Sequence, residues 1–140
     1  IKLREDDVPW VPKIADFGLA KRLATDSGQT QTGAILGTPS YMAPEQAAAR
    51  KDIGPAADVY ALGAILYEML TGRPPFRAAT GYDTILQVIN EDPVPPRRLA
   101  GKVPVELETI CLKCLAKPVH RRYASAQELV DELGRFLNGE

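Results

Sequence analysis

The chain has 140 residues, of which 45% are hydrophobic and 25% are charged, a balance typical of one soluble globular domain or a large piece of one. Its net charge of −1 gives no electrostatic reason to expect nucleic acid or an anionic membrane surface as a partner. Two cysteines and no apolar run of about 18 residues argue against a disulfide-rich secreted scaffold and against a membrane span in this segment, so we expect a cytoplasmic location. Because Ile1 stands inside an alternating run and is not a methionine, we expect a segment of a longer protein.

Residues 1–18 predict a short β-hairpin. Ile1–Arg4 alternates apolar and charged residues, Glu5–Asp7 forms a polar turn, and a second short strand is expected from Val11 to Phe17. Residues 24–40 are rich in Thr, Ser, Gly and Gln without a sustained period, which is the composition of a loop.

The strongest helix signal spans Ala56 to Leu70, where apolar residues recur at steps of three and four. Alanines fill positions between them, so the helix is apolar on most sides and we expect it to be buried all round. Gly72 marks its C-terminal end.

Two shorter helices are expected on either side of it. Proline suits a first helical turn, so residues 44–50, with the sequence PEQAAAR, predict a short helix. Thr80 and Asp83 resemble a capping box that opens a helix to about Asn90. Residues 91–98, EDPVPPRR, follow as a proline-rich connector.

The C-terminal region predicts two more helices, one from Glu106 to Ala116 and one behind a capping box formed by Ser125 and Glu128. The expected fold class is therefore mainly α with a short β-hairpin. Cys111 and Cys114 form a C-x-x-C pattern one helical turn apart without a second pair, so core packing is favoured over zinc binding or redox chemistry.

Asp16, Phe17 and Gly18 stand together at the end of the second strand expected in the hairpin. A carboxylate is a hard oxygen ligand, suited to a Mg²⁺ ion that bridges nucleotide phosphates. The aromatic ring anchors such a turn, and glycine lets the backbone bend. An acid before a turn is usually an ordinary turn residue, so the triplet gains its weight from the motifs that accompany it.

Two further motifs supply that context: GTPSYMAPE at residues 37–45, and DVYALGAIL, which begins at Asp58. In this order the sequence resembles the C-terminal half of the eukaryotic-type protein kinases, and TGAILGTPSYMAPEQA with KCLAK and RRYASA looks most like their bacterial branch. The resemblance implies that residues 1–140 form part of a protein kinase fold. It divides them into the hairpin and metal triplet (1–18), the activation segment (16–45) and the helical C-terminal lobe (46–140).

The resemblance also implies roles for individual residues. Asp16 corresponds to the Mg²⁺ ligand, and the cofactor-binding triplet comprises Asp16, Phe17 and Gly18. Four residues match the loop that docks the protein substrate: Gly37, Thr38, Pro39 and Tyr41. In the family, a threonine at the position of Thr38 points to serine/threonine rather than tyrosine substrates, with a simple turn threonine as the alternative.

In the family, the motif matched by Ala43–Glu45 ends the activation segment, and its glutamate meets an arginine near the last helices. The stretch RRYASA places Arg122 there, with Arg121 as the competing candidate. Such a buried pair would pin the activation segment to the helical lobe. Pro118–Val119 departs from the Asp-Pro that often precedes this arginine, which leaves the conformation of the local loop open.

Asp58 matches a residue that supports the catalytic loop from below, and plain stabilisation of a helix N-terminus is its alternative role. The loop carries four candidate phosphorylation sites: Thr25, Ser27, Thr30 and Thr32. Thr30 and Thr32 are the preferred two, and Lys21 matches a position that contacts such a phosphate. Unmodified, solvated loop residues are the alternative for each.

The 140 residues contain no glycine-rich phosphate loop, no strand lysine with a partner helix glutamate, and no catalytic loop with its base aspartate and asparagine. His120 begins a His-Arg-Arg stretch that echoes the catalytic loop but lacks the aspartate, so we expect an exposed loop residue. The expected function is the C-terminal portion of a serine/threonine protein kinase, which transfers the γ-phosphoryl group of ATP to protein substrates and is inactive as this chain alone.

The expected cofactors are ATP and Mg²⁺. The expected partners are protein substrates and a second kinase for autophosphorylation in a dimer, with no nucleic acid and no membrane contact from this segment. A membrane anchor elsewhere in the complete protein stays open. One alternative is a non-catalytic docking module derived from a kinase lobe. A second is a degraded gene remnant, for which exposed apolar surface on helix 56–70 predicts poor solubility and loose packing.

Overall fold

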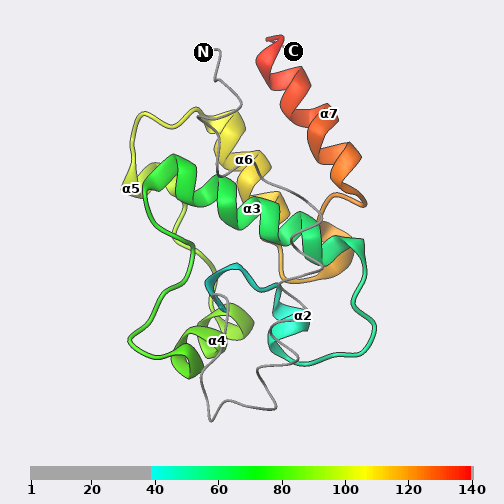
Figure 1. Cartoon of the computed structure of the whole chain (residues 1–140). Coiled ribbons are helices and arrows are strands. Elements are labelled where there is room, and N and C mark those ends of the chain that lie inside the picture. The colour runs from blue at the N-terminus through cyan, green and yellow to red at the C-terminus, as the bar shows by residue number, and fades with distance from the viewer. Residues whose placement is uncertain (1–38, 140) are drawn as a thin grey trace, which may run out of the picture. The chain divides into compact units, whose positions relative to one another are not determined.

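The computed structural model of the chain describes residues 39–139, in which every regular element is a helix. In chain order these are η2 (Pro39–Tyr41), α2 (Pro44–Ala47), α3 (Pro55–Thr71), α4 (Gly81–Asn90), α5 (Pro96–Leu99), α6 (Val105–Cys114), η3 (Val119–Arg121) and α7 (Ala126–Leu137) (Figure 1). The mainly helical prediction is confirmed for this part of the chain. The hairpin predicted over 1–18 lies outside the described residues.

Local capping signals place several helix ends where the sequence predicts them. The Thr80 hydroxyl accepts a hydrogen bond from the Asp83 N–H at 3.1 Å and starts α4. The Ser125 hydroxyl accepts one from the Glu128 N–H at 3.2 Å and starts α7. Gly72 ends α3 with φ 87°, a left-handed conformation that glycine adopts without steric cost.

The short helix predicted over residues 44–50 is wrong at its C-terminal end, because α2 stops at Ala47. Ala49 adopts φ 57°, a left-handed conformation rare for a residue with a Cβ atom. The Arg50 N–H then donates to the Glu45 carbonyl oxygen at 2.9 Å and closes the turn. This turn leads the chain away from α2 before α3 begins.

The connector EDPVPPRR also differs from its prediction, because its last residues form the single helical turn α5. Pro96 occupies the first helical position, where the missing N–H of proline is harmless. A carboxylate oxygen of Glu108 on α6 accepts a hydrogen bond from the Arg97 N–H at 2.8 Å. A contact from a later helix therefore caps α5, and local sequence does not reveal such a contact.

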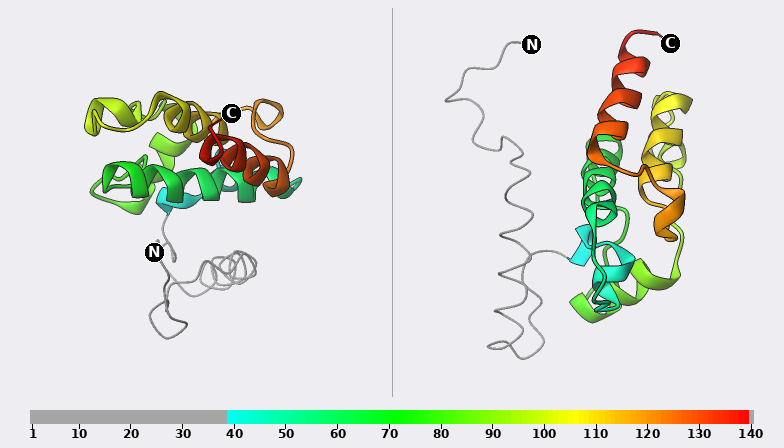
Figure 2. Two further views of the ribbon diagram at one scale, coloured as in Figure 1. Left: turned by 90° about the horizontal axis from the view of Figure 1, so that it is seen from above. Right: turned by 90° about the vertical axis from the view of Figure 1, so that its right-hand side faces the viewer.

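Helix α3 runs through the middle of the described residues. It contacts α6 and α7 on one side and η2 on the other, as the two views in Figure 2 show. One core cluster joins α3 to the residue before α2 and to the end of α6, and comprises Ala43, Ala57, Tyr60, Ala64, Tyr67, Cys111 and Leu115. A second lies toward α7 and comprises Val59, Ile110, Cys114, Tyr123 and Leu129. The apolar periodicity of α3 thus serves two separate packing faces.

Helices α3 and α6 approach each other closely at Gly63. A Cβ atom added to Gly63 would lie 2.3 Å from the Cβ atom of Cys114, closer than two such atoms can pack. The Cys111 thiol donates toward the Gly63 carbonyl oxygen at 3.5 Å. The two cysteines are free and fully buried, one in each core cluster, so their predicted packing role is confirmed.

The prediction that the helix of residues 56–70 is buried all round is wrong at its last turn. Met69 is 74% exposed, because the neighbouring helices pack on the other sides of α3. Within residues 39–139, no helix combines the length and the apolar character needed to cross a bilayer.

Candidate functional site

The structure describes five of the residues assigned to a site from the sequence. They are Pro39, Tyr41, Glu45, Asp58 and Arg122. The remaining candidates lie outside the described residues, namely Asp16, Phe17, Gly18, Lys21, Thr25, Ser27, Thr30, Thr32, Gly37 and Thr38. The described part of the site is therefore the Ala43–Glu45 motif with the residues just before it, and the helices against which they pack.

Arg122 and Glu45 form a buried ion pair that joins η3 to α2. Two guanidinium nitrogens of Arg122 each donate to one carboxylate oxygen of Glu45, both at 2.7 Å. Arg122 is 4% exposed and Glu45 is 6% exposed. This bidentate geometry is the strongest arrangement available to the two groups, and low exposure protects it from screening by salt.

The remaining hydrogens of the Arg122 guanidinium bind main-chain carbonyl oxygens. Nη1 also donates to Ala56 at 3.0 Å, Nη2 to Lys117 at 3.0 Å, and Nε to Ala116 at 2.6 Å. All five N–H groups of the side chain are thereby used. The network ties together the start of α2, the start of α3 and the segment that follows α6.

The charge of Glu45 is stabilised by this network. Burial alone raises the pKa of the Glu45 carboxyl, but hydrogen bonds from Arg122 and the backbone, together with the positive charges of Arg122 and Arg50, outweigh it and hold the pKa below its usual range. Arg121, the competing candidate, is exposed. Of the two adjacent arginines, the structure joins Arg122 to Glu45.

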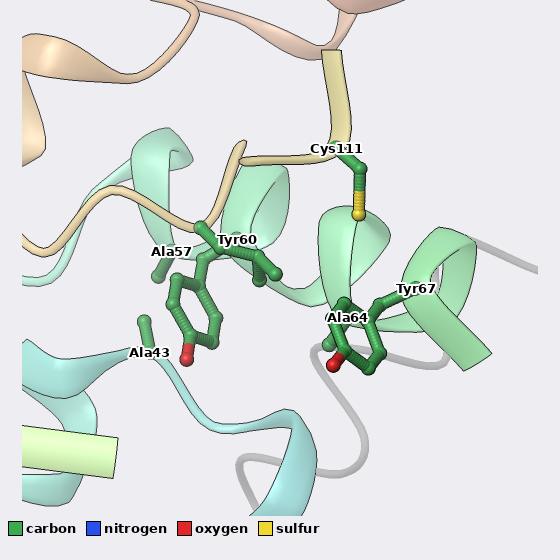
Figure 3. Packing of buried hydrophobic residues seen from close by; sticks show 7 residues of the cluster. Ala43, Ala57, Tyr60, Ala64, Tyr67 and Cys111 are labelled. Carbon is green, nitrogen blue, oxygen red and sulfur yellow. The ribbon is translucent and has the colours of Figure 1, made fainter. Parts of the chain in front are cut away.

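The ring of Tyr60 packs against the Arg122 guanidinium. The guanidinium carbon lies 5.2 Å from the centroid of the Tyr60 ring, a distance suited to a cation–π contact. Figure 3 shows the Tyr60 hydroxyl directed toward Ala43, the residue before α2. This hydroxyl is buried, has no hydrogen-bond partner among the described residues, and burial raises its pKa. Sequence reasoning does not single out Tyr60, because its apolar neighbours make it look like an ordinary core residue.

Tyr41 anchors η2 to α3. Its hydroxyl donates to a carboxylate oxygen of Glu68. Burial, the hydrogen bond to Glu68 and the charge of Glu68 raise the pKa of Tyr41 to about 12, while Arg77 acts in the opposite direction. Glu68 was not predicted as a site residue, although an acid ten positions after Asp58 in an apolar helix is a usable signal.

Asp58 lies half-buried in the first turn of α3. A carboxylate at this place is favoured by the helix macrodipole, whatever else it contacts. Pro39 opens η2, and His120 is an exposed residue of η3.

The cysteine pair lies in the core, with one thiol in each core cluster. Burial, as the largest cause, raises the pKa of each thiol, Cys111 and Cys114, to about 12, so both stay protonated near neutral pH. Over residues 39–139, no group of three or more His, Cys, Asp or Glu side chains is placed to hold a metal ion.

Comparisons with known proteins fit this geometry. A family model described as the protein kinase domain matches residues 3–133. The serine/threonine-protein kinase PknB of Mycobacterium leprae is 41% identical over 129 residues, and that of Mycobacterium tuberculosis is 44% identical over 131 residues. Each alignment covers 91% of this chain and 20% of the relative, so the chain spans about a fifth of their length.

A solved structure supports the same fold. The autoinhibited serine kinase domain of the giant muscle protein titin matches with a TM-score of 0.63 at 24% sequence identity. The match covers 73% of this chain and 30% of that one. At this level of identity, the likeness speaks for the fold alone.

Proposed function

Because the chain belongs to the protein kinase domain family, we propose that it is the C-terminal part of a serine/threonine protein kinase. In the complete protein, this kinase transfers the γ-phosphoryl group of ATP to a Ser or Thr hydroxyl of protein substrates. The observation that carries the proposal is the closed network between Glu45 and Arg122, which fastens the Ala43–Glu45 motif to the helices. The names of the two PknB relatives support serine and threonine as acceptors.

The anchors at Glu45 and Tyr41 support a docking role for the residues before them. Glu45 is held by Arg122, and Tyr41 is held by Glu68, so the chain between them is fixed at two points. We infer a docking role for Gly37 and Thr38, which precede this fixed segment in the sequence, with Thr38 selecting a hydroxyl acceptor. Rigid support of this kind is how a protein positions a substrate for transfer.

We assign the Mg²⁺ ligand to Asp16 and the cofactor contacts to Asp16, Phe17 and Gly18, all outside the described residues. When bound, Mg²⁺ would be held by Asp16 and would supply charge neutralisation for the nucleotide phosphates. Asp58 supports the catalytic loop of the complete domain. Phosphorylation at Thr30 and Thr32 orders the activation segment, and Lys21 contacts the phosphate.

Substitutions in the complete protein test the proposal. Asp16→Asn removes a metal-ligand charge, so we expect phosphate transfer from labelled ATP to a protein substrate to fall by more than about 100-fold. Glu45→Gln loosens the anchored segment, and we expect a loss of about tenfold or more. Glu132→Gln on α7, far along the chain from both, serves as the control with unchanged activity. Full activity of Asp16→Asn would overturn the kinase assignment.

The chain of 140 residues alone tests the other half of the proposal. Its sequence holds no catalytic base motif, so we expect no ATP-dependent phosphorylation of a generic protein substrate. The alternative function is a non-catalytic docking module. A reading frame that encodes His-Arg-Asp, an asparagine five residues later and a strand lysine upstream of Ile1 supports the kinase. A start codon and ribosome site just before Ile1 support the module.

A further inference from the structure

Helix α4 has no positively charged residue of its own to stabilise its C-terminal end. Its last turn carries no basic residue, and the acidic residues Glu91 and Asp92 follow it directly. The C-terminal end of a helix leaves carbonyl oxygens unpaired and carries partial negative charge, so acids there are unfavourable. A positively charged donor from another element would offset both effects.

Lys117 provides such a donor from the segment between α6 and η3. Its Nζ donates to the Val88 carbonyl oxygen, in the last turn of α4, at 2.7 Å. The same ammonium lies 4.8 Å from the centroid of the Phe76 ring, which is buried in the segment before α4. Burial lowers the pKa of Lys117, whereas the charges of Asp92 and Glu91 act to raise it.

The main chain of the same segment belongs to the network of the site. Arg122 binds the carbonyl oxygens of Ala116 and Lys117, at 2.6 and 3.0 Å, while it holds Glu45. Helix α4 in turn packs against η2 and α2, the two elements that carry Tyr41 and Glu45. Arg122 fixes the backbone of the segment that contains Lys117, and the Lys117 side chain binds α4. Lys117 therefore links this segment to α4.

We infer that Lys117 is the positioning residue of α4, and that its ammonium holds the C-terminal end of this helix against the segment anchored by Arg122. The inference goes beyond the proposed function, because the contact exists whether or not the protein transfers phosphate. The inference also gives α4 a different kind of support from that of the other helices. Helices α3, α6 and α7 are held by apolar clusters, whereas α4 depends in part on one charged contact.

Hydrogen exchange of the 140-residue chain tests this inference. Lys117→Met keeps the apolar stem and removes the donor and the charge. We expect the amides of residues 84–91 to exchange about tenfold faster or more, with those of α3 and α6 unchanged. Lys117→Arg should restore most of the protection, because it keeps the charge and the donors. Lys113→Met is the matched control, since Lys113 lies 4.4 Å from the Tyr123 ring.

Three results would overturn the inference: unchanged protection of α4 in Lys117→Met, equal acceleration in every helix, or the same loss in α4 for Lys113→Met. A measurement on the unaltered chain covers the case in which Lys117→Met does not fold. An N-hydroxysuccinimide ester of acetic acid should acylate Lys117 more slowly than the exposed Lys113, because the Lys117 amine is engaged and half-buried. The two rates are compared per neutral amine, from their pH dependence, because a lowered pKa gives Lys117 a larger reactive fraction. Equal rates per neutral amine would refute the contact.

Discussion

Two ion pairs, Glu45–Arg122 and Glu132–Arg135, join the same residue types in opposite surroundings. In the first, the side chains of Arg122 and Glu45 are 0% and 7% exposed and come from segments 77 positions apart. In the second, the Arg135 and Glu132 side chains are 54% and 36% exposed and lie three positions apart on α7. The first pair connects parts of the fold that nothing local connects. The second adds to a helix that its cap and apolar face already specify.

Two glycines show the same difference between the packed interior and α7. Gly63 lies where α3 and α6 touch, and an added Cβ atom has no room there. Gly134 lies in α7, and an added Cβ atom would meet nothing within 4 Å. The centre of the molecule therefore constrains residue choice by contact, whereas α7 leaves it to helix propensity.

Loss of the arginine should give the largest difference between the two regions. Arg122→Met leaves Glu45 buried without a partner, so we expect the free energy of unfolding to fall by about 3–5 kcal/mol. Arg135→Met removes an exposed pair and should change it by less than about 1 kcal/mol. Urea unfolding of the two variants, followed by circular dichroism, measures both values. Equal destabilisation would mean that burial of the pair carries no weight.

The two glycines should differ in the sign of the effect. Gly63→Ala forces α3 and α6 apart, and we expect a loss of about 1–3 kcal/mol in the free energy of unfolding. Gly134→Ala removes backbone entropy from the unfolded chain without a clash, and we expect a gain of about 0.5–1 kcal/mol. Thermal unfolding resolves the two directions. A stabilised Gly63→Ala variant would show that the helices are free to separate.

The pH dependence of stability should also differ between the buried and the exposed ion pair. We expect this difference to be the smallest of the three, since it appears only in acid. The pKa of Glu45 is lower in the folded chain than in the unfolded chain, so around these values the unfolded state binds more protons. The stabilisation is complete above the unfolded pKa of about 4.5 and is lost as the pH falls through the folded value. Unfolding free energies measured as the pH falls from about 7 through the unfolded pKa of about 4.5 and below it should flatten in Glu45→Gln and keep their slope in Glu132→Gln. Parallel curves for all three proteins would remove Glu45 as a source of acid sensitivity.

The features predicted well from the sequence are those that depend on neighbours along the chain. Thr80 and Ser125 begin helices because each hydroxyl accepts an N–H three residues later, and that spacing is visible in the sequence. The end of α2 was predicted wrongly, since Ala49 is a good helix former that nevertheless adopts a left-handed conformation. Propensity alone gives no warning of such a turn.

The site shows the same division. The family motif points to Glu45, but the choice between Arg121 and Arg122 depends on which one turns into the core, and adjacent residues look alike in sequence. The bonds from Tyr41 to Glu68 and from Lys117 to Val88 cross 27 and 29 positions. Such contacts follow from tertiary packing, so no local sequence pattern predicts them.

The saturation of the Arg122 side chain makes it a built-in spectroscopic reporter. Because all five of its hydrogens are held by carboxylate or carbonyl oxygens, we expect hindered rotation about the Nε–Cζ bond and slow exchange with water. Each proton should then give its own magnetic resonance signal, where most arginines give one averaged signal. The packing of the Ala43–Glu45 segment against the helices can thus be followed from a single residue.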